Sequence, residues 1–368
     1  MKSRLWDTFS DLIQIDSVSF MERELCDELK KRLEQLGIET KEDGAGRQIE
    51  GNCGNLFGFL PGALPLEPVL LSAHMDTVEP GQGKRAIFQD EDKIISEGET
   101  VLGADDVAGI AVILEAITRL RETNMPHRPI ELLFSVAEER YCLGSAYADH
   151  TKIQAKECYL LDQPGTIGKA ANAGPTVLSF SVTIEGKAAH AGFAPQDGIH
   201  AILVASRAIS RISLGGVAPG VTVNIGLIEG GTANNIVPEC CVVTGEIRSI
   251  VHEECIEKWR KIKGIFEEEA NEMRAKVTFT DKIVTTAFET PFHASVVTRF
   301  QKACEQLEIP SEINYTLGVS DQNNFALHGI EGLVLACSMH KVHSTDEYAR
   351  LSEMEQCVEL LMLLLTED

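Results

Sequence analysis

Apolar residues recur along the chain at spacings that alternate between those of helices and strands. The first pattern is helical and runs from Leu5 to Leu36, where Gly37 provides a C-cap for the second of two predicted helices. Short apolar runs at 56–59 and 69–73 predict strands, and a periodic stretch at 107–121 predicts a longer helix. This alternation predicts an α/β sheet, in which functional sites lie beyond the carboxyl ends of the strands.

The pattern changes near Pro175. From there the predicted order is strand 177–184, helix 199–212, strands 222–227 and 239–247, helix 253–274 and strand 277–286. The order βαββαβ is that of a small ferredoxin-like α+β unit.

The first pattern resumes at Pro291 with a helix, a strand at 333–337 and a last helix at 353–365. A chain of 368 residues is longer than one core usually supports, so two domains are expected. The predicted boundaries are 1–175 and 290–368 for a mixed α/β domain flanked by helices, and 176–289 for the domain inserted into it.

Histidines and acidic residues stand where apolar runs of the first domain end. They come from five segments: His74 with Asp76, Asp105, Glu138 with Glu139, Asp162, and His343. The strand period of two places His74 and Asp76 on one side, so the carboxylate could fix the imidazole ring of a metal ligand. Alone, this pair would be read as ordinary hydrogen bonding at a strand end. The matching groups on the other segments favour a metal site.

The donor types suit divalent transition metals. Two histidines with several carboxylates match zinc, cobalt or manganese, whereas calcium prefers oxygen ligands alone. The set is large enough for two ions, which one carboxylate must then bridge. At Glu138-Glu139 one ligand suffices, which leaves the other carboxylate free to take a proton from water. Structural readings also exist: a solvated pair at Glu138-Glu139, a helix N-terminal pair at Asp105-Asp106 and a turn at Asp162.

Five motifs resemble the M20 metallopeptidases in order and spacing. They are His74-Met75-Asp76-Thr77, Gly103-Ala104-Asp105-Asp106, Glu138-Glu139, Asp162 and His343-Ser344-Thr345-Asp346-Glu347. The stretches 74–81 and 102–116 are most similar to the peptidase T-like branch, the tripeptide aminopeptidases. The resemblance implies a zinc-peptidase-like catalytic domain with an inserted lid and dimerisation domain.

The resemblance also implies a role for each matching residue. Five would be metal ligands: His74 and Asp162 on one zinc ion, Glu139 and His343 on the other, and Asp105 bridging the two. Asp76 would orient His74, and Glu138 would be the general base. A cis peptide bond after Asp105 is implied as well.

Four further residues match the family outside this set. His190 lies among small residues and would otherwise be read as structural; the resemblance implies that it reaches the active site of the other subunit of a homodimer and stabilises the oxyanion. Asn235 and Arg248 match substrate-contacting residues, and an arginine suits a peptide carboxylate, although Arg248 could equally belong to an exposed sheet face. Gly318 matches a glycine-rich substrate loop, in which Leu317 replaces a second glycine.

The composition of the chain indicates which binding partners and which cellular compartment to expect. The formal charge of -23, from 56 acidic and 33 basic residues, would repel nucleic acid and anionic membranes. Residues 360–365 are too short to span a bilayer, the start of the chain lacks the apolar core of a signal peptide, and the ten scattered cysteines are typical of reduced thiols. We predict a cytoplasmic protein.

The predicted function is a dizinc hydrolase of short peptides that releases the N-terminal residue of tripeptides. An N-acyl-amino-acid deacylase or a carboxypeptidase is the alternative, because the same metal core cleaves many amides. A peptide-binding protein without catalysis is a third reading, against which the presence of Glu138 argues.

Overall fold

The computed structural model describes residues 3–367, and its internal contacts divide the chain into two compact units. The larger unit contains the chain up to Ala173, then Glu289–Tyr315 and the residues from Val319 onward. The smaller unit contains Gly174–Phe288 and Thr316–Gly318. Each unit has its own cluster of buried apolar side chains, which forms its hydrophobic core.

The larger unit is built on a mixed sheet with the strand order β1-β2-β6-β3-β7-β16-β8-β14, and β15 pairs with β8. These strands are β1 (Thr40–Glu42), β2 (Leu56–Leu60), β3 (Val69–His74), β6 (Ile130–Ser135), β7 (Glu157–Pro164), β8 (Lys169–Gly174), β14 (Phe288–Glu289), β15 (Glu312–Tyr315) and β16 (Glu331–Met339). The four neighbours β6, β3, β7 and β16 run parallel, so their carboxyl ends meet at one edge of the sheet. A separate small sheet joins β4 (Ala86–Phe88), β5 (Lys93–Ser96) and β17 (Tyr348–Arg350).

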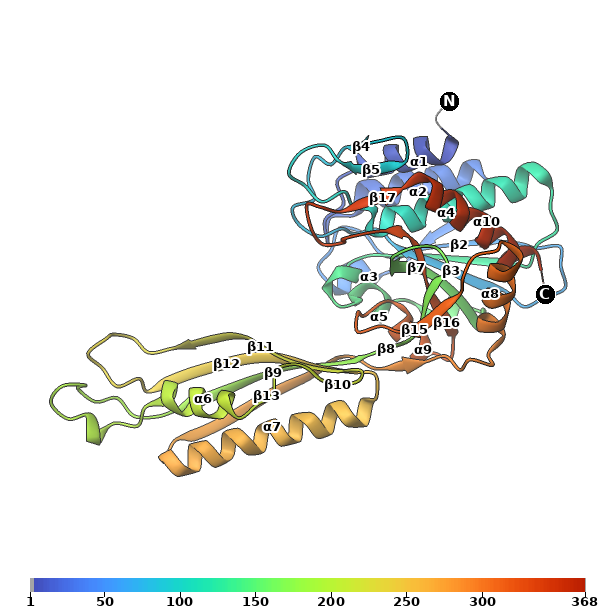
Figure 1. Cartoon of the computed structure of the whole chain (residues 1–368). Coiled ribbons are helices and arrows are strands. Elements are labelled where there is room, and N and C mark those ends of the chain that lie inside the picture. The colour runs from blue at the N-terminus through green and yellow to red at the C-terminus, as the bar shows by residue number, and fades with distance from the viewer. Residues whose placement is uncertain (1–2, 368) are drawn as a thin grey trace. The chain divides into compact units, whose positions relative to one another are not determined.

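Helices cover both faces of the large sheet (Figure 1). They are α1 (Arg4–Ile13), α2 (Arg23–Gln35), α3 (Ala45–Gln48), α4 (Ala104–Thr123), α5 (Leu143–Ala146), α8 (Ser295–Gln306), α9 (Gln322–Leu327) and α10 (Leu351–Thr366). Figure 1 shows α1, α4 and α10 on one face and α5 and α9 on the other. The helical stripe of α1, which includes Leu5, Phe9 and Ile13, is fully buried against α4, and each such side chain contributes about 2 kcal/mol by leaving water. The predicted mixed α/β fold flanked by helices is confirmed.

The start of α4 departs from regular helix geometry. Asp105 and Asp106 have non-helical backbone angles, and regular helix begins at Val107, where the sequence pattern predicts it. The Asp105-Asp106 peptide bond is cis, as the family resemblance implied. These two residues therefore form an irregular entry to the helix, directly beneath the carboxyl ends of β3, β7 and β16, on which α4 packs.

The smaller unit is a five-stranded antiparallel sheet with the order β10-β11-β12-β9-β13. Its elements are β9 (Thr176–Glu185), α6 (Ala201–Ser210), β10 (Gly215–Ala218), β11 (Val221–Gly230), β12 (Cys240–Ser249), α7 (His252–Met273) and β13 (Lys276–Thr285). The helices α6 and α7 pack side by side on one face (Figure 1). The sequence prediction of four strands is wrong at β10, because Gly215-Gly216 and Pro219-Gly220 read as turn residues rather than as a strand.

Within residues 3–367, none of the helices combines the length and the apolar character that crossing a bilayer requires.

Candidate metal centre

Side chains from five segments of the larger unit meet at the carboxyl edge of the parallel strands. His74 is the last residue of β3, and Asp162 lies near the end of β7. Glu138 and Glu139 open the turn that follows β6, Asp105 lies at the entry to α4, and His343 follows β16. The parallel order of β6, β3, β7 and β16 explains why residues so far apart in sequence come together.

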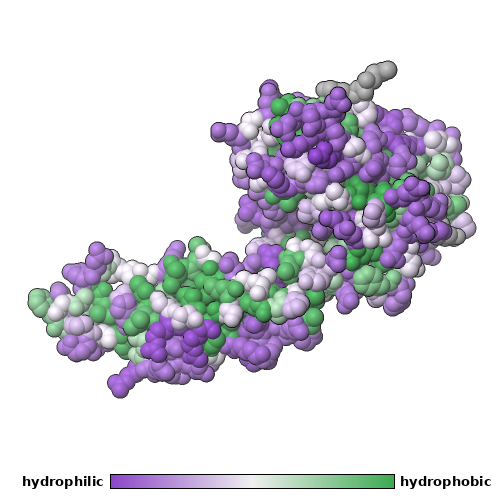
Figure 2. All heavy atoms as spheres, in the orientation of Figure 1, coloured by the Kyte–Doolittle hydropathy of each residue, from purple (hydrophilic) through white to green (hydrophobic). Residues whose placement is uncertain are grey.

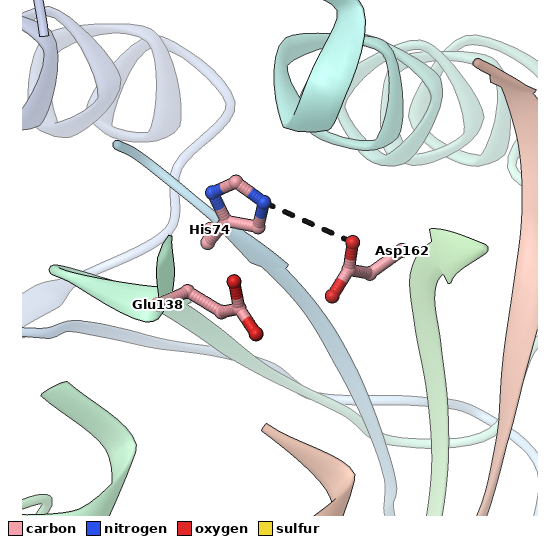
Figure 3. A group of neighbouring side chains, drawn as sticks. All are labelled: His74, Glu138 and Asp162. Carbon is pink, nitrogen blue, oxygen red and sulfur yellow. Dashed lines mark ion pairs between the residues drawn. The ribbon is translucent and has the colours of Figure 1, made fainter. Parts of the chain in front are cut away.

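Asp105 lies between the two imidazoles. Its Oδ1 is 3.0 Å from Nε2 of His74, and its Oδ2 is 3.3 Å from Nε2 of His343. Nε2 of His343 is also 2.9 Å from Oε1 of Glu139, and Nε2 of His74 is 3.8 Å from Oδ1 of Asp162 (Figure 3). Each oxygen of one carboxylate thus faces a different histidine, and a further carboxylate completes each side.

Glu138 points toward the same space as His74 and Asp162 (Figure 3). One ligand atom each of His74, Glu138 and Asp162 lies within 4.8 Å of the others, and the same holds for His74, Asp105 and Glu139. His343 is the exposed member of the cluster, with 52% of its side chain accessible, whereas the His74 side chain is 1% accessible. The cluster is therefore open to solvent on the His343 side.

The ring of His74 is fixed mainly by a backbone group. Its Nδ1 is 2.8 Å from the carbonyl oxygen of Asp76 and 3.5 Å from the carboxylate of that residue. The Nδ1–H therefore donates to the carbonyl, and Nε2, which faces Asp105, is the ring nitrogen that could bind a metal ion. The Asp76 carboxylate is the more distant partner of the same nitrogen, and the expectation that Asp76 orients His74 stays a prediction.

The Asp76 carboxylate also holds the turn that follows β6. It accepts hydrogen bonds from the backbone N–H of Glu138 at 2.8 Å, from that of Glu139 at 3.2 Å and from the Ser19 hydroxyl at 2.8 Å. Asp76 is 1% exposed, so these three donors satisfy a buried carboxylate. One residue thereby fixes both an imidazole, through its carbonyl, and the turn with the two glutamates, through its side chain.

Negative charge dominates the electrostatics of the cluster. Burial, reinforced by the charge of Asp162, raises the pKa of Glu138 well above its usual range, and burial does the same for Asp162. Burial, the largest single influence, would lower the pKa of His74, but hydrogen bonds to Asp105 and Asp76 together with the charges of Asp162 and Asp105 raise it. Hydrogen bonds to Asp105 and to a second carboxylate raise the pKa of His343 to about 10. A group that brings positive charge would fit this site.

The other predicted site residues lie in the smaller unit. Nδ1 of His190 accepts the backbone N–H groups of Gly192 at 3.1 Å and Phe193 at 3.2 Å, and its ring stacks on Phe193. The carbonyl of Asn235 accepts the N–H of Ala191 at 2.9 Å, and His190 pairs with Ile236. The structure therefore brings the loops of His190 and Asn235 together.

Arg248 lies on β12 beside the loop that contains Gly318. Its Nε donates to Oε1 of Glu246 at 2.8 Å and its Nη2 contacts Oε2 at 3.4 Å, while Nη1 donates to the carbonyl of Leu317 at 2.9 Å. Gly318 is exposed and its N–H donates to the Thr316 hydroxyl. Arg248 is thus already paired on one edge of its guanidinium.

Several known proteins are similar to the chain. Residues 175–274 match the M20 peptidase dimerisation domain, and residues 55–191 match peptidase family M28. The uncharacterised protein YqjE of Bacillus subtilis is 36% identical over 366 residues, which is 100% of this chain and 98% of that protein. The crystal structure of aminopeptidase PepT from Bacillus cereus is 35% identical, with a TM-score of 0.94 over 99% of this chain and 97% of that one. The crystal structure of a tripeptidase from Staphylococcus aureus is 30% identical, with a TM-score of 0.96 over the same shares.

The chain belongs to the M20 peptidase family, in its peptidase T-like branch. This M20 chain contains buried acidic groups near the centre that sequence reasoning missed. Asp106 accepts the N–H of His74 at 3.1 Å, and Glu347 accepts those of Gly103 at 2.7 Å and Asp105 at 3.0 Å. Both residues stand in motifs that resemble the family. In the sequence alone, however, an acidic neighbour of a metal ligand cannot be distinguished from a solvated acidic residue.

Replacing Asp76 tests how the site is held. Asp76→Ala leaves three donors without their acceptor, and each unsatisfied buried donor costs about 1–3 kcal/mol. We expect the free energy of unfolding in urea to fall by about 3 kcal/mol or more. Glu34→Ala, at an exposed position, is the control and should change it by less than about 0.5 kcal/mol. Equal stability of Asp76→Ala and wild type would contradict this account.

Proposed function

We propose that the chain is a dizinc aminopeptidase that releases the N-terminal residue of tripeptides. The observation that carries the proposal is Asp105, whose two oxygens face two different imidazoles with Glu138 beside them. A carboxylate in that position is suited to bridge two cations. The substrate class is supported by the likeness to a PepT aminopeptidase and to a tripeptidase, both at 30% identity or more.

The donor set fits two divalent ions. His74 and Asp162 would hold one, His343 and Glu139 the other, and Asp105 both. Imidazole with carboxylate favours zinc, and cobalt or manganese suits the same donors. When bound, the ions would lower the pKa of water and polarise the scissile carbonyl.

Glu138 has the surroundings of a general base that later acts as an acid. Its carboxylate is 5% exposed, and the Cys142 thiol donates to Oε1 at 3.2 Å, which limits how the side chain can turn. Glu138 would take a proton from the attacking water. Glu138 would hold that proton until the amine leaves and then transfer it.

His190 is prepared to donate a hydrogen bond. Since Nδ1 accepts two backbone N–H groups, the neutral ring carries its proton on Nε2. That N–H would stabilise the oxyanion, in the active site of the partner subunit of a homodimer.

Arg248 would bind the C-terminal carboxylate of the peptide, with Asn235 and Gly318 as further substrate contacts. Glu246 occupies the edge formed by Nε and Nη2, and Leu317 takes one N–H of Nη1. Among the contacts of the described residues, one N–H on each terminal nitrogen stays available. These two donors suit a carboxylate.

A peptide panel with one active-site variant tests the function. Wild type should release the N-terminal residue of free tripeptides, and removal of metal by a chelator should abolish this until Zn²⁺ is added back. Glu138→Gln should lower kcat by about 10²–10⁴-fold at unchanged metal content, because only proton transfer is lost. Glu91→Gln, at an exposed position, is the control.

Two outcomes would overturn the proposal. Cleavage of N-acylated amino acids or of C-terminal residues alone would replace it with a deacylase or a carboxypeptidase. Peptide binding without turnover would leave a binding protein, and equal turnover in Glu138→Gln would remove the role of that residue.

The role of Arg248 predicts a dependence on the substrate's C-terminus. Arg248→Lys loses bidentate binding, so we expect KM for a free tripeptide to rise about tenfold or more, while KM for the same tripeptide with an amidated C-terminus stays unchanged. Steady-state kinetics with both substrates measure this. A parallel rise for the amide would show that Arg248 does not bind the carboxylate.

We further propose that the smaller unit forms the homodimer. Among the described residues, β10 pairs with β11 only at 221–223, which leaves the outer edge of 224–230 without a strand partner. Apolar residues gather on the side of the smaller unit that Figure 2 shows, and exposed apolar residues of α6 and β11 include Leu203, Leu227 and Ile228, at 46%, 64% and 49% exposure. An open edge beside an apolar patch is suited to a second copy. The cytoplasmic location stays a prediction from the sequence.

Charge placed on this patch should dissociate the dimer. We expect Leu227→Asp to sediment with the mass of one chain under conditions in which wild type sediments as two, because the carboxylate cannot be buried unpaired. Met125→Asp replaces an exposed apolar residue of the larger unit and should stay dimeric. A dimeric Leu227→Asp would place the interface elsewhere.

A further inference from the structure

The turn that carries Glu138 and Glu139 has a strained backbone. Ala137, Tyr141 and Cys142 have φ angles of 48°, 61° and 57°, in the left-handed region that favours glycine. Each such residue costs roughly 1–2 kcal/mol. A turn of this kind keeps its shape only where the surrounding groups hold it.

Side chains from three distant segments hold it. Four successive backbone N–H groups donate to side-chain oxygens: Val136 to Oδ1 of Asn55 at 3.1 Å, Ala137 to Oε1 of Glu22 at 3.0 Å, and Glu138 and Glu139 to the Asp76 carboxylate at 2.8 and 3.2 Å. The chain therefore leaves β6 along a row of fixed acceptors. Their positions determine where the two glutamate side chains start.

Glu22 is the acceptor in this row whose burial leaves one carboxylate oxygen without a hydrogen bond among the described residues. It is fully buried, and its Oε1 accepts the N–H of Ala137 and also that of Phe20 at 2.8 Å. Phe20 is itself left-handed, with a φ of 75°, so one oxygen stabilises two strained residues. The side-chain Oε2 has no hydrogen-bond partner among the described residues. Burial, and then the charge of Asp76, raises the pKa of Glu22 to about 7.

We propose that Glu22 is a positioning residue for the peptidase reaction, which sets the geometry of Glu138 and Glu139 through the N–H of Ala137. The inference rests on the proposed function. The competing explanation is local: Glu22 precedes α2 and binds the N–H of Phe20, which by itself would only order the start of that helix. The contact with Ala137, 115 residues away in sequence, distinguishes the two.

Two substitutions separate geometry from charge. Glu22→Asp keeps the carboxylate next to its own segment but, one methylene shorter, withdraws it from Ala137. Glu22→Gln keeps an acceptor oxygen at full length without the charge. Glu24→Asp, an exposed glutamate two residues along, is the matched control.

Hydrogen exchange, Zn²⁺ titration of the metal-free protein and steady-state kinetics provide three readouts. For Glu22→Asp we expect faster amide exchange in the segment 136–142, about ten- to hundredfold weaker binding of one of the two ions and a similar loss in kcat with little change in KM. Glu22→Gln should recover most of each. A merely local role predicts a lower melting temperature with all three readouts unchanged, and that result would overturn the proposal.

The readouts also separate the two proposals. If wild type cleaves no peptide, the proposed function fails, while exchange in 136–142 still decides whether Glu22 holds the turn. If Glu22→Asp exchanges, binds Zn²⁺ and turns over like Glu24→Asp, Glu22 has no positioning role whatever the substrate is.

Discussion

Uncompensated negative charge is the constraint around which the larger unit is arranged. Four carboxylates meet two imidazoles at the edge of the sheet, and among residues 3–367 no lysine or arginine forms an ion pair with any of these carboxylates. Buried anions of this kind are costly unless cations approach them. Three further buried carboxylates around the cluster, those of Asp76, Asp106 and Glu347, accept hydrogen bonds from backbone N–H groups. The surrounding protein leaves the balancing positive charge to whatever binds between the imidazoles.

The same acceptors give the centre its rigidity. Asp76 connects the end of β3 to the turn after β6, and Glu347 connects the segment after β16 to the entry of α4. Asp321, at the start of α9, accepts hydrogen bonds from the hydroxyls of Ser135, before the turn that follows β6, and of Ser145, after it. Asp321 therefore holds this turn at both of its ends. The backbones of His74, Asp105 and Glu139 are therefore each bound to a carboxylate of another segment, and a loss at one position would affect the others.

The sequence identifies the proposed metal ligands better than the residues that hold these ligands in position. Alternation along strands and the resemblance together singled out His74, Asp105, Glu139, Asp162 and His343, whose atoms the structure brings together. The acceptors Glu22 and Asn55 gave no comparable signal, because their partners lie 115 and 81 residues away and local periodicity carries no information on such pairs. Asp76 shows a second limit: its place in the motif was recognised, but the hydrogen bonds of its carbonyl to His74 and of its carboxylate to Glu138 depend on the path of the chain after β3, which the sequence pattern does not describe.

The position of β16 has a consequence for how the protein is made. This strand lies between β7 and β8 in the sheet, yet it follows the whole smaller unit in the chain. During synthesis on the ribosome, the sheet of the larger unit therefore stays incomplete while more than a hundred intervening residues are added. His343 is synthesised after β16. A nascent chain cannot assemble the full centre before His343 has been synthesised, so an M20 enzyme of this topology gains its hydrolytic competence only after the whole smaller unit has been made.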